Sequence, residues 1–138
     1  MKKSIMTEKA SSAFRNYARL GLTSSRSALD TVCKIRGICS DSTALDMLAV
    51  FDTMRLLDFL GDKIATRAVN DIYFATASKK LQANEITLRI RRLADEMHCD
   101  DRTVYRRLKK ARDMWEFIRR REKKQTAGKR SLLRELIT

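Results

Sequence analysis

The side chains with the clearest chemistry are cations, and they recur at helical spacing after Asp101. If this segment is an α-helix, an advance of about 100° per residue separates an apolar stripe from a basic face. The stripe contains Val104, Leu108, Ala111, Trp115 and Ile118, and the basic face contains Arg102, Arg106, Lys109 and Lys110. An arginine fork can bind guanine through two hydrogen bonds, and a lysine places a point charge against phosphate. The pattern predicts one face that packs and another that contacts nucleic acid.

The individual side chains of this basic helix are expected to have different roles. The residues expected to reach base edges are Arg102, Thr103, Arg106 and Lys110. Those expected to contact phosphate, or to belong to the helix framework, are Tyr105, Arg107, Lys109 and Arg112. The alternative interpretation is an ordinary solvated helix face.

A shorter helix and a turn come before the basic helix. Ala94 supplies the small side chain needed where two helices cross at roughly 90–120°. Residues 98–100 are expected to form the turn, with Asp100 as the N-cap of the basic helix. Many such turns carry glycine where this chain has His98, because the residue there is left-handed. The capped turn, the small crossing residue and the one-sided basic face together predict a helix-turn-helix.

The same residues carry a resemblance to a known family. The segments 93–97, LADEM, and 101–108, DRTVYRRL, resemble the helix-turn-helix of sigma factor region four and of sigma-like regulators from phages and prophages of Gram-positive bacteria. The segment 68–74 is similar to the helix that precedes this motif in those proteins. The resemblance covers roughly residues 68–115. It implies a sequence-specific transcription regulator of phage or mobile-element origin that binds double-stranded DNA.

The same residues are also compatible with other functions. A DNA-binding adaptor, such as a small terminase subunit or a protein that contacts RNA polymerase, would use the same basic helix. An enzyme is not expected, because the only histidine lies in the turn and no serine or cysteine is paired with a base. We expect no cofactor and no metal. Small helix-turn-helix proteins often bind spaced half-sites as dimers, so a homodimer is one possible assembly, for which the N-terminal helices or the C-terminal tail could supply the interface.

Charge and length agree with a polyanionic partner. The chain has 138 residues and a formal net charge of +13. Residues 1–80 hold 13 basic and 8 acidic side chains, whereas residues 81–138 hold 17 and 9. The excess of positive charge therefore concentrates around the predicted motif, where it would attract polyanions. The length fits one domain, or a small domain with an N-terminal extension.

Neither a membrane span nor a cysteine framework is expected. No run approaches the roughly 20 apolar residues of a transmembrane helix, and the N-terminus lacks the apolar stretch of a signal peptide. We therefore expect a cytoplasmic protein without membrane contact. Cys33, Cys39 and Cys99 form no CxxC pair, so neither a disulfide nor a zinc site is indicated, and small buried residues are expected. His98 is expected to be structural or solvated.

The apolar periodicity predicts an all-α fold, a multi-helix bundle containing the helix-turn-helix. There is no proline, and each of the four glycines lies near the end of a helical run. Helices are expected at 6–20, 27–36, 42–60, 62–78, 84–97, 101–124 and 129–136. Three regions are expected: 1–62 as a helical support, 63–124 as the DNA-binding region, and 125–138 as a basic linker with a short C-terminal helix.

The supporting helices are expected to build the core. The segment 42–60 is expected to be a central buried helix, because apolar residues wrap much of its circumference: Leu45, Leu48, Ala49, Phe51, Met54, Leu56, Leu57 and Leu60. A ligand pocket lined by these residues is the less frequent alternative. The segment 62–78 is expected to support the motif with Ile64, Ala68, Ile72 and Ala75.

Two features at the C-terminal end have open interpretations. Arg119, Arg120 and Arg121 either extend the phosphate-binding surface or form a solvated helix end that complements the helix dipole. The tail after Gly128 has leucines at helical spacing. Because so short an amphipathic helix is marginal alone, we expect it to dock on its own domain or on a partner.

Overall fold

The computed structural model describes residues 8–21 and 41–137, with side-chain surroundings for 8–21 and 42–121. In the described residues every regular element is helical, so the all-α prediction is confirmed there. The elements are α1 (Lys9–Arg19), α3 (Asp41–Phe59), α4 (Lys63–Ala68), the π-helix η1 (Val69–Phe74), α5 (Glu85–Glu96) and α6 (Asp101–Ile137). None of these helices is long and apolar enough to cross a membrane. The expected helix at 27–36, which contains Cys33, lies outside the described residues, and so does Cys39.

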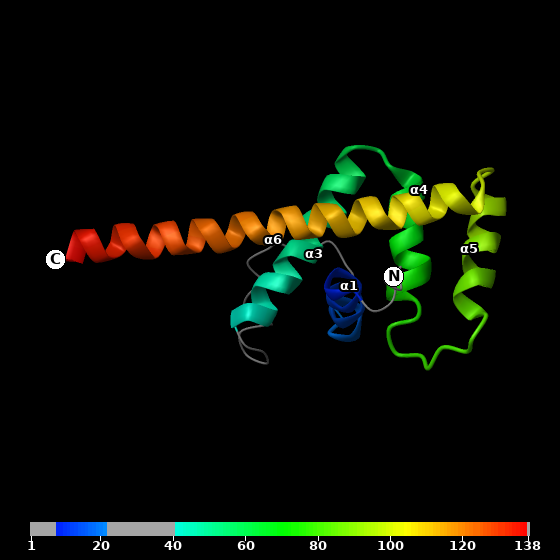
Figure 1. Cartoon of the computed structure of the whole chain (residues 1–138), viewed down its shortest axis with the longest axis horizontal. Helices are drawn as coiled ribbons and strands as arrows, with labels where there is room; N and C mark the ends of the chain where they lie inside the picture. Colours follow the sequence, from blue (N-terminus) through cyan, green and yellow to red (C-terminus); the bar gives the residue numbers. More distant parts are fainter. Residues whose placement is uncertain (1–7, 22–40, 138) are drawn as a thin grey trace.

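The long helix α6 is the centre of the fold. It packs against α1, α3, α4 and α5, which lie along its first half (Figure 1). Val104, Leu108, Ala111 and Trp115 are each at most 2% exposed, so the predicted apolar stripe of α6 is confirmed for these four, and Ile118 is partly buried against the same core. A single core contains residues from all six elements, and it spans the expected regions 1–62 and 63–124.

The helix α3 is less buried than its composition predicts. Ala49, Val50 and Leu57 are fully buried, but Leu56 is 40% exposed and Leu60, just beyond the helix end, is 56% exposed. The prediction of a central buried helix is therefore wrong for the last turn of α3, where Leu56 and Phe59 are exposed. Apolar residues on all sides of a helix can be buried only if neighbours cover all sides, and α3 has its main neighbours in α6, α1 and α4.

The expected helix at 62–78 is divided in two. An α-helical part, α4, passes into the π-helix η1, where the backbone N–H of Ala75 donates to the carbonyl of Asn70, five residues earlier. A π turn contains more residues than an α turn, so the inward face advances by a residue. Consequently Thr76 is buried and Ala75 is exposed, although the α-helical period predicts Ala75 on the supporting face. Ala68 and Ile72 are buried as expected.

The C-terminal helix also differs from the expectation. α6 continues without interruption to Ile137, where a basic linker over 125–138 and a separate helix at 129–136 were expected. Gly128 costs about 1 kcal/mol relative to alanine inside a helix, which is too little to end a helix when no proline follows. The other glycines near described helix ends behave as predicted, since Gly21 and Gly61 adopt positive φ angles of 75° and 70°.

Candidate nucleic-acid interface

The connection between α5 and α6 is a four-residue turn closed by backbone hydrogen bonds. The N–H of Cys99 donates to the carbonyl of Ala94 at 3.0 Å, and the N–H of His98 donates to that of Asp95 at 3.3 Å. These two bonds form a Schellman motif, in which the residue after the C-cap is left-handed. His98 occupies that position with φ of 54°, as its place in the turn predicts.

Asp100 begins α6 as predicted. One of its carboxylate oxygens accepts hydrogen bonds from the Thr103 backbone N–H at 2.8 Å and from the Thr103 hydroxyl at 2.7 Å. These bonds from Thr103 hold the pKa of Asp100 below its ordinary value, with a smaller contribution from the charges of Arg102 and Arg106. The Thr103 hydroxyl therefore serves the helix cap, whereas the sequence suggested a contact with a base edge.

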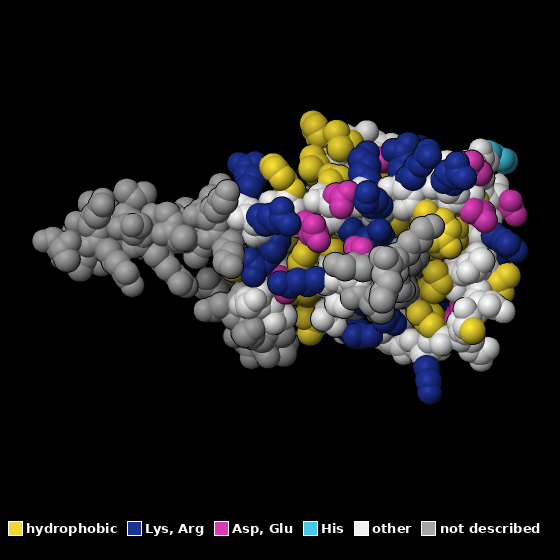
Figure 2. All heavy atoms as spheres, in the orientation of Figure 1, with side chains coloured by type: hydrophobic (Ala, Val, Ile, Leu, Met, Phe, Trp, Pro, Cys, Tyr) yellow, Lys and Arg dark blue, Asp and Glu magenta, His cyan; other side chains and the backbone are white. Residues whose placement is uncertain are grey.

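Four of the predicted residues lie on the exposed side of α6. Arg102, Tyr105, Arg106 and Lys109 are exposed and follow the helical period. Within the described part of the chain, no carboxylate forms an ion pair with Arg102, Arg106 or Lys109, although Arg102 and Arg106 lie near Asp100. Lysine and arginine side chains follow the course of α6 in Figure 2. This side of the helix thus presents three cations that form no ion pair with the described residues.

Two other predicted cations belong to an ion-pair cluster. Asp62 Oδ2 accepts hydrogen bonds from Arg107 Nη1 at 2.8 Å and from Lys110 Nζ at 2.6 Å. The other oxygen of Asp62 caps α4 by accepting from the Ala65 N–H at 3.1 Å. Burial by itself would raise the pKa of Asp62, but the bonds from Lys110 and Ala65 and the two positive charges together lower it. Lys110 was expected to reach a base edge, and the structure instead places it against α4.

Arg112 lies in the interior. Only 7% of it is exposed, its Nε donates to Glu8 Oε2 at 2.9 Å, and its Nη1 donates to the Tyr73 hydroxyl at 3.0 Å. Ser11 donates to the same hydroxyl at 3.1 Å, and the Tyr73 ring stacks on Phe14 with centroids 5.5 Å apart. The inclusion of Arg112 among the DNA contacts is therefore corrected: it joins α6 to α1 and η1, in agreement with the alternative framework role.

The three arginines near the middle of α6, Arg119, Arg120 and Arg121, have different surroundings. Arg119 Nε donates to Asp46 Oδ1 at 2.7 Å, and its side chain is 14% exposed. Arg120 has a side chain that is 81% exposed, and the exposed Arg121 lies over the Phe117 ring with its guanidinium carbon 5.9 Å from the centroid. Arg119 therefore fixes α6 to α3, and only Arg120 and Arg121 are accessible as the sequence suggested.

Asp62 and two cations of α5 also belong to this region, although they are not among the predicted residues. Arg91 and Arg92 are exposed on the helix before the turn, and Arg91 lies 3.6 Å from Asp101. The sequence could have indicated their exposure, because both arginines lie outside the apolar period of α5. The apolar residues of that period, Ile90, Leu93 and Ala94, are buried. The sequence could also have indicated the capping role of Asp62, because this residue directly follows Gly61 and precedes the first residue of a helix.

The accessible part of the predicted site consists of Arg102, Tyr105, Arg106 and Lys109, a surface we call the α6 basic face. It has no feature of a metal centre, since the described residues contain no group of three histidine, cysteine, aspartate or glutamate side chains that could hold an ion.

Comparisons of the chain with protein-family models, with curated proteins and with solved structures found no significant match.

Proposed function

We propose that α5, the turn and the first part of α6 form a helix-turn-helix that binds double-stranded DNA. The α6 basic face is the observation that carries this proposal. A folded protein usually pairs its clustered cations or disperses them, and here three cations on one helical face have no carboxylate ion pair in the described chain, while neighbouring Arg107 and Lys110 do. Phosphate groups and base edges supply the acceptors that this face lacks.

The accessible residues have distinct roles in the proposed complex. Arg102 and Arg106 lie in the first turns of α6, the part of a recognition helix that enters the major groove. Their guanidinium groups can bind guanine through O6 and N7. Lys109 and the Tyr105 hydroxyl lie on the same face and bind phosphate. Exposed Arg91 and Arg92 on α5 add phosphate contacts on the other side of the turn.

The rest of the fold supports this placement of α6. The Asp62 cluster, the Arg112 bonds and the Trp115 indole, which donates to the Asp46 carbonyl at 3.0 Å, join α6 to α4, α1 and α3. A recognition helix held at several points keeps its side chains oriented before DNA arrives, which lowers the entropic cost of binding. With the resemblance to sigma factor region four, this favours a sequence-specific transcription regulator.

The test is selection of binding sites from random duplexes, followed by affinity measurements on the selected site. The triple variant Arg102→Gln, Arg106→Gln and Lys109→Gln is expected to lose the preferred site. A control triple variant, Arg55→Gln, Lys63→Gln and Lys80→Gln, removes the same charge from exposed positions outside α6 and should retain the preferred site. Equal loss in the two variants, or failure to select any site, would reject sequence-specific recognition by α6.

A further inference from the structure

Exposed apolar side chains gather where the end of α3 meets α6. Leu56, Phe59 and Leu60 are 40%, 86% and 56% exposed, and Phe117 on α6 is 63% exposed. The three residues at the end of α3 have the i, i+3, i+4 spacing that places side chains on one side of a helix. Hydrophobic side chains are visible at the upper edge of the molecule in Figure 2, near the turn that joins α3 to α4 in Figure 1.

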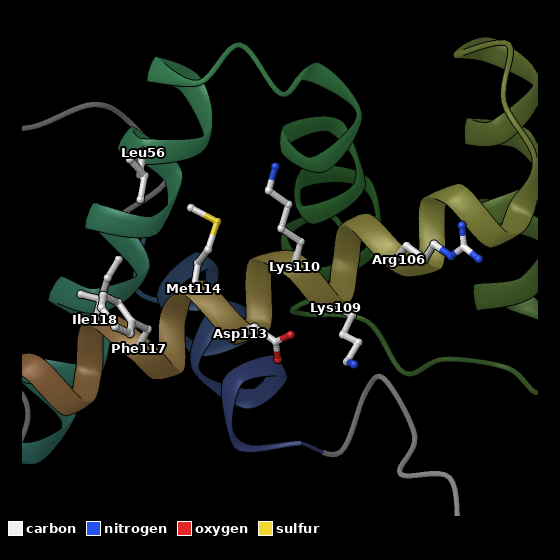
Figure 3. A pocket seen from close by; sticks show the side chains of 8 residues that line it. All are labelled: Leu56, Arg106, Lys109, Lys110, Asp113, Met114, Phe117 and Ile118. Carbon is white, nitrogen blue, oxygen red and sulfur yellow. The ribbon is translucent and has the colours of Figure 1, made fainter.

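A groove connects this apolar surface with the α6 basic face. At one end its walls are apolar, with Leu56 from α3 facing Met114, Phe117 and Ile118 from α6 (Figure 3). Toward the start of α6 the lining becomes charged, with Arg106, Lys109, Lys110 and Asp113. A contiguous apolar surface with a polar rim is typical of sites that bind another protein.

The charges of the groove favour an acidic occupant. Of the three lining cations, Lys110 is paired with Asp62, whereas Arg106 and Lys109 have no ion pair among the described residues. Asp113 is the lining carboxylate. Beyond the apolar end, Arg120 has a side chain that is 81% exposed and lies 4.0 Å from Glu116 one turn earlier. An occupant with carboxylates beside its apolar residues would therefore match both parts of the groove.

We propose that this groove binds the apolar face of an acidic amphipathic helix from another protein. The apolar residues of that helix, at i, i+3, i+4 and i+7, would contact Leu56, Met114 and Phe117, and its carboxylates would pair with Arg106 and Lys109. A second copy of this chain fits less well, because it would bring a formal charge of +13 against the same cations. Nucleic acid alone would leave the phenylalanine and leucine side chains uncovered.

The position of the groove has a consequence that rests on the proposed function. Arg106 and Lys109 line the groove and also belong to the α6 basic face. A carboxylate that pairs with Arg106 excludes a phosphate or guanine from the same guanidinium. The acidic partner and DNA therefore compete for this protein, and each weakens the binding of the other.

The probe is a labelled helical peptide of about 16 residues, with leucines at i, i+3, i+4 and i+7 and glutamates at one end, titrated with the full chain. A second peptide has lysine in place of every glutamate. The acidic peptide is expected to bind and the lysine peptide is not. No binding of the acidic peptide, or equal binding of both peptides, would overturn the proposal.

Matched variants locate the binding site. Phe117→Ser and Arg106→Glu should each weaken binding of the acidic peptide by about tenfold or more. Leu88→Ser removes an exposed leucine from α5, and Lys80→Glu reverses a distant charge, so neither should change the affinity. Equal effects of Phe117→Ser and Leu88→Ser would contradict a site at the groove. A dimer in sedimentation equilibrium that Phe117→Ser dissociates would make a second copy the occupant.

Competition is measured separately with the duplex selected for this protein. Displacement of the acidic peptide by that duplex supports the shared use of Arg106 and Lys109. Unchanged peptide affinity at saturating duplex would refute the competition, while binding of the peptide itself would still support the groove. If no duplex is selected, the proposed DNA-binding function fails, and the peptide measurements alone decide the docking proposal.

Discussion

Asp62, the N-cap of α4, accepts a hydrogen bond from Lys110 Nζ at 2.6 Å across 48 residues of sequence. The same carboxylate oxygen also accepts from Arg107, so one anion fixes the start of α4 to two successive turns of α6. Its side chain is 8% exposed, which shields these ion pairs from solvent more than a surface pair. The orientation of α6 depends on a residue that the basic pattern of the sequence does not include.

Replacing Asp62 should therefore destabilise the fold. Asp62→Ala removes the α4 cap and leaves two cations without their anion, so we expect the free energy of unfolding to fall by about 1–3 kcal/mol. Urea denaturation followed by circular dichroism measures the change. Asp58→Ala, an exposed carboxylate at the end of α3, is the matched control and should cost less than about 0.5 kcal/mol. Equal effects would show that Asp62 contributes no more than an ordinary surface carboxylate.

The stabilising effect of Asp62 should depend on pH. Because its pKa in the folded chain lies below the ordinary value of 3.8, its charge stabilises the fold above that value, and this stabilisation is lost as the pH falls through the folded pKa. Asp62→Asn keeps a capping oxygen but has no charge. Wild type should therefore exceed Asp62→Asn in stability at about pH 7, and this advantage should decrease progressively as the pH falls below the ordinary pKa of 3.8. A difference that does not change with pH would contradict this role.

Arg106 should read a base. Arg106→Ala is expected to cost about 1–3 kcal/mol of binding free energy on the selected site and to relax the preference at one base position. Lys109→Ala removes the same charge nearby and should weaken all duplexes about equally, because phosphate contacts carry no sequence preference. Binding measurements on the selected site and its single-base variants distinguish the two. If both substitutions weaken all duplexes alike, Arg106 contacts phosphate.

Trp115 should be structural. It is 2% exposed and its indole N–H donates to the Asp46 carbonyl, so Trp115→Ala is expected to lower the free energy of unfolding by about 3–5 kcal/mol. Phe117→Ala removes an exposed aromatic ring two residues later and should change it by less than about 0.5 kcal/mol. Thermal unfolding followed by circular dichroism compares them. Loss of DNA binding by Trp115→Ala without a change in stability would place the ring at the nucleic acid instead.

The two accessible arginines near the middle of α6, Arg120 and Arg121, should not contact the duplex that the α6 basic face binds. At 1.5 Å per residue, Arg120 lies about 21 Å along the helix from Arg106, further than the major groove width of about 12 Å. Arg120→Gln with Arg121→Gln should therefore leave the salt dependence of DNA affinity unchanged. Arg102→Gln with Lys109→Gln should reduce the slope of log affinity against log salt by up to about two units. A similar reduction from the first pair would extend the interface to Arg121.

Local features of the candidate site were predictable because neighbouring residues determine them. The burial of Val104 and Leu108 follows from helical periodicity, and the Asp100 cap follows from its place before the helix. The left-handed His98 follows from the short turn. Each of these features depends on residues within a few positions along the chain, which is the range over which sequence patterns are informative.

Features that depend on distant contacts were not predictable. Arg112 lies at the edge of the apolar stripe of α6, and periodicity cannot show whether another helix covers that edge. Its partners Tyr73 and Glu8 are 39 and 104 residues away. The division between accessible and buried cations on α6 therefore depends on tertiary packing. The π turn before Ala75 is a similar case, because it changes which residues face the core without a marked change in composition.

Because α6 is one continuous helix, the number of residues between its two ends determines their relative rotation about the helix axis. A helix from Asp101 to Ile137 extends over about 55 Å, and each added residue rotates the remainder of the helix by about 100° and advances it by about 1.5 Å. The described core residues of α6 end at Ile118, so a residue inserted after Gly128 would leave that core intact. It would nevertheless rotate the last turns of the helix relative to its first turns, which carry the α6 basic face. The number of residues between 119 and 137 thus determines how far the C-terminal end of α6 is rotated about the helix axis relative to its first turns.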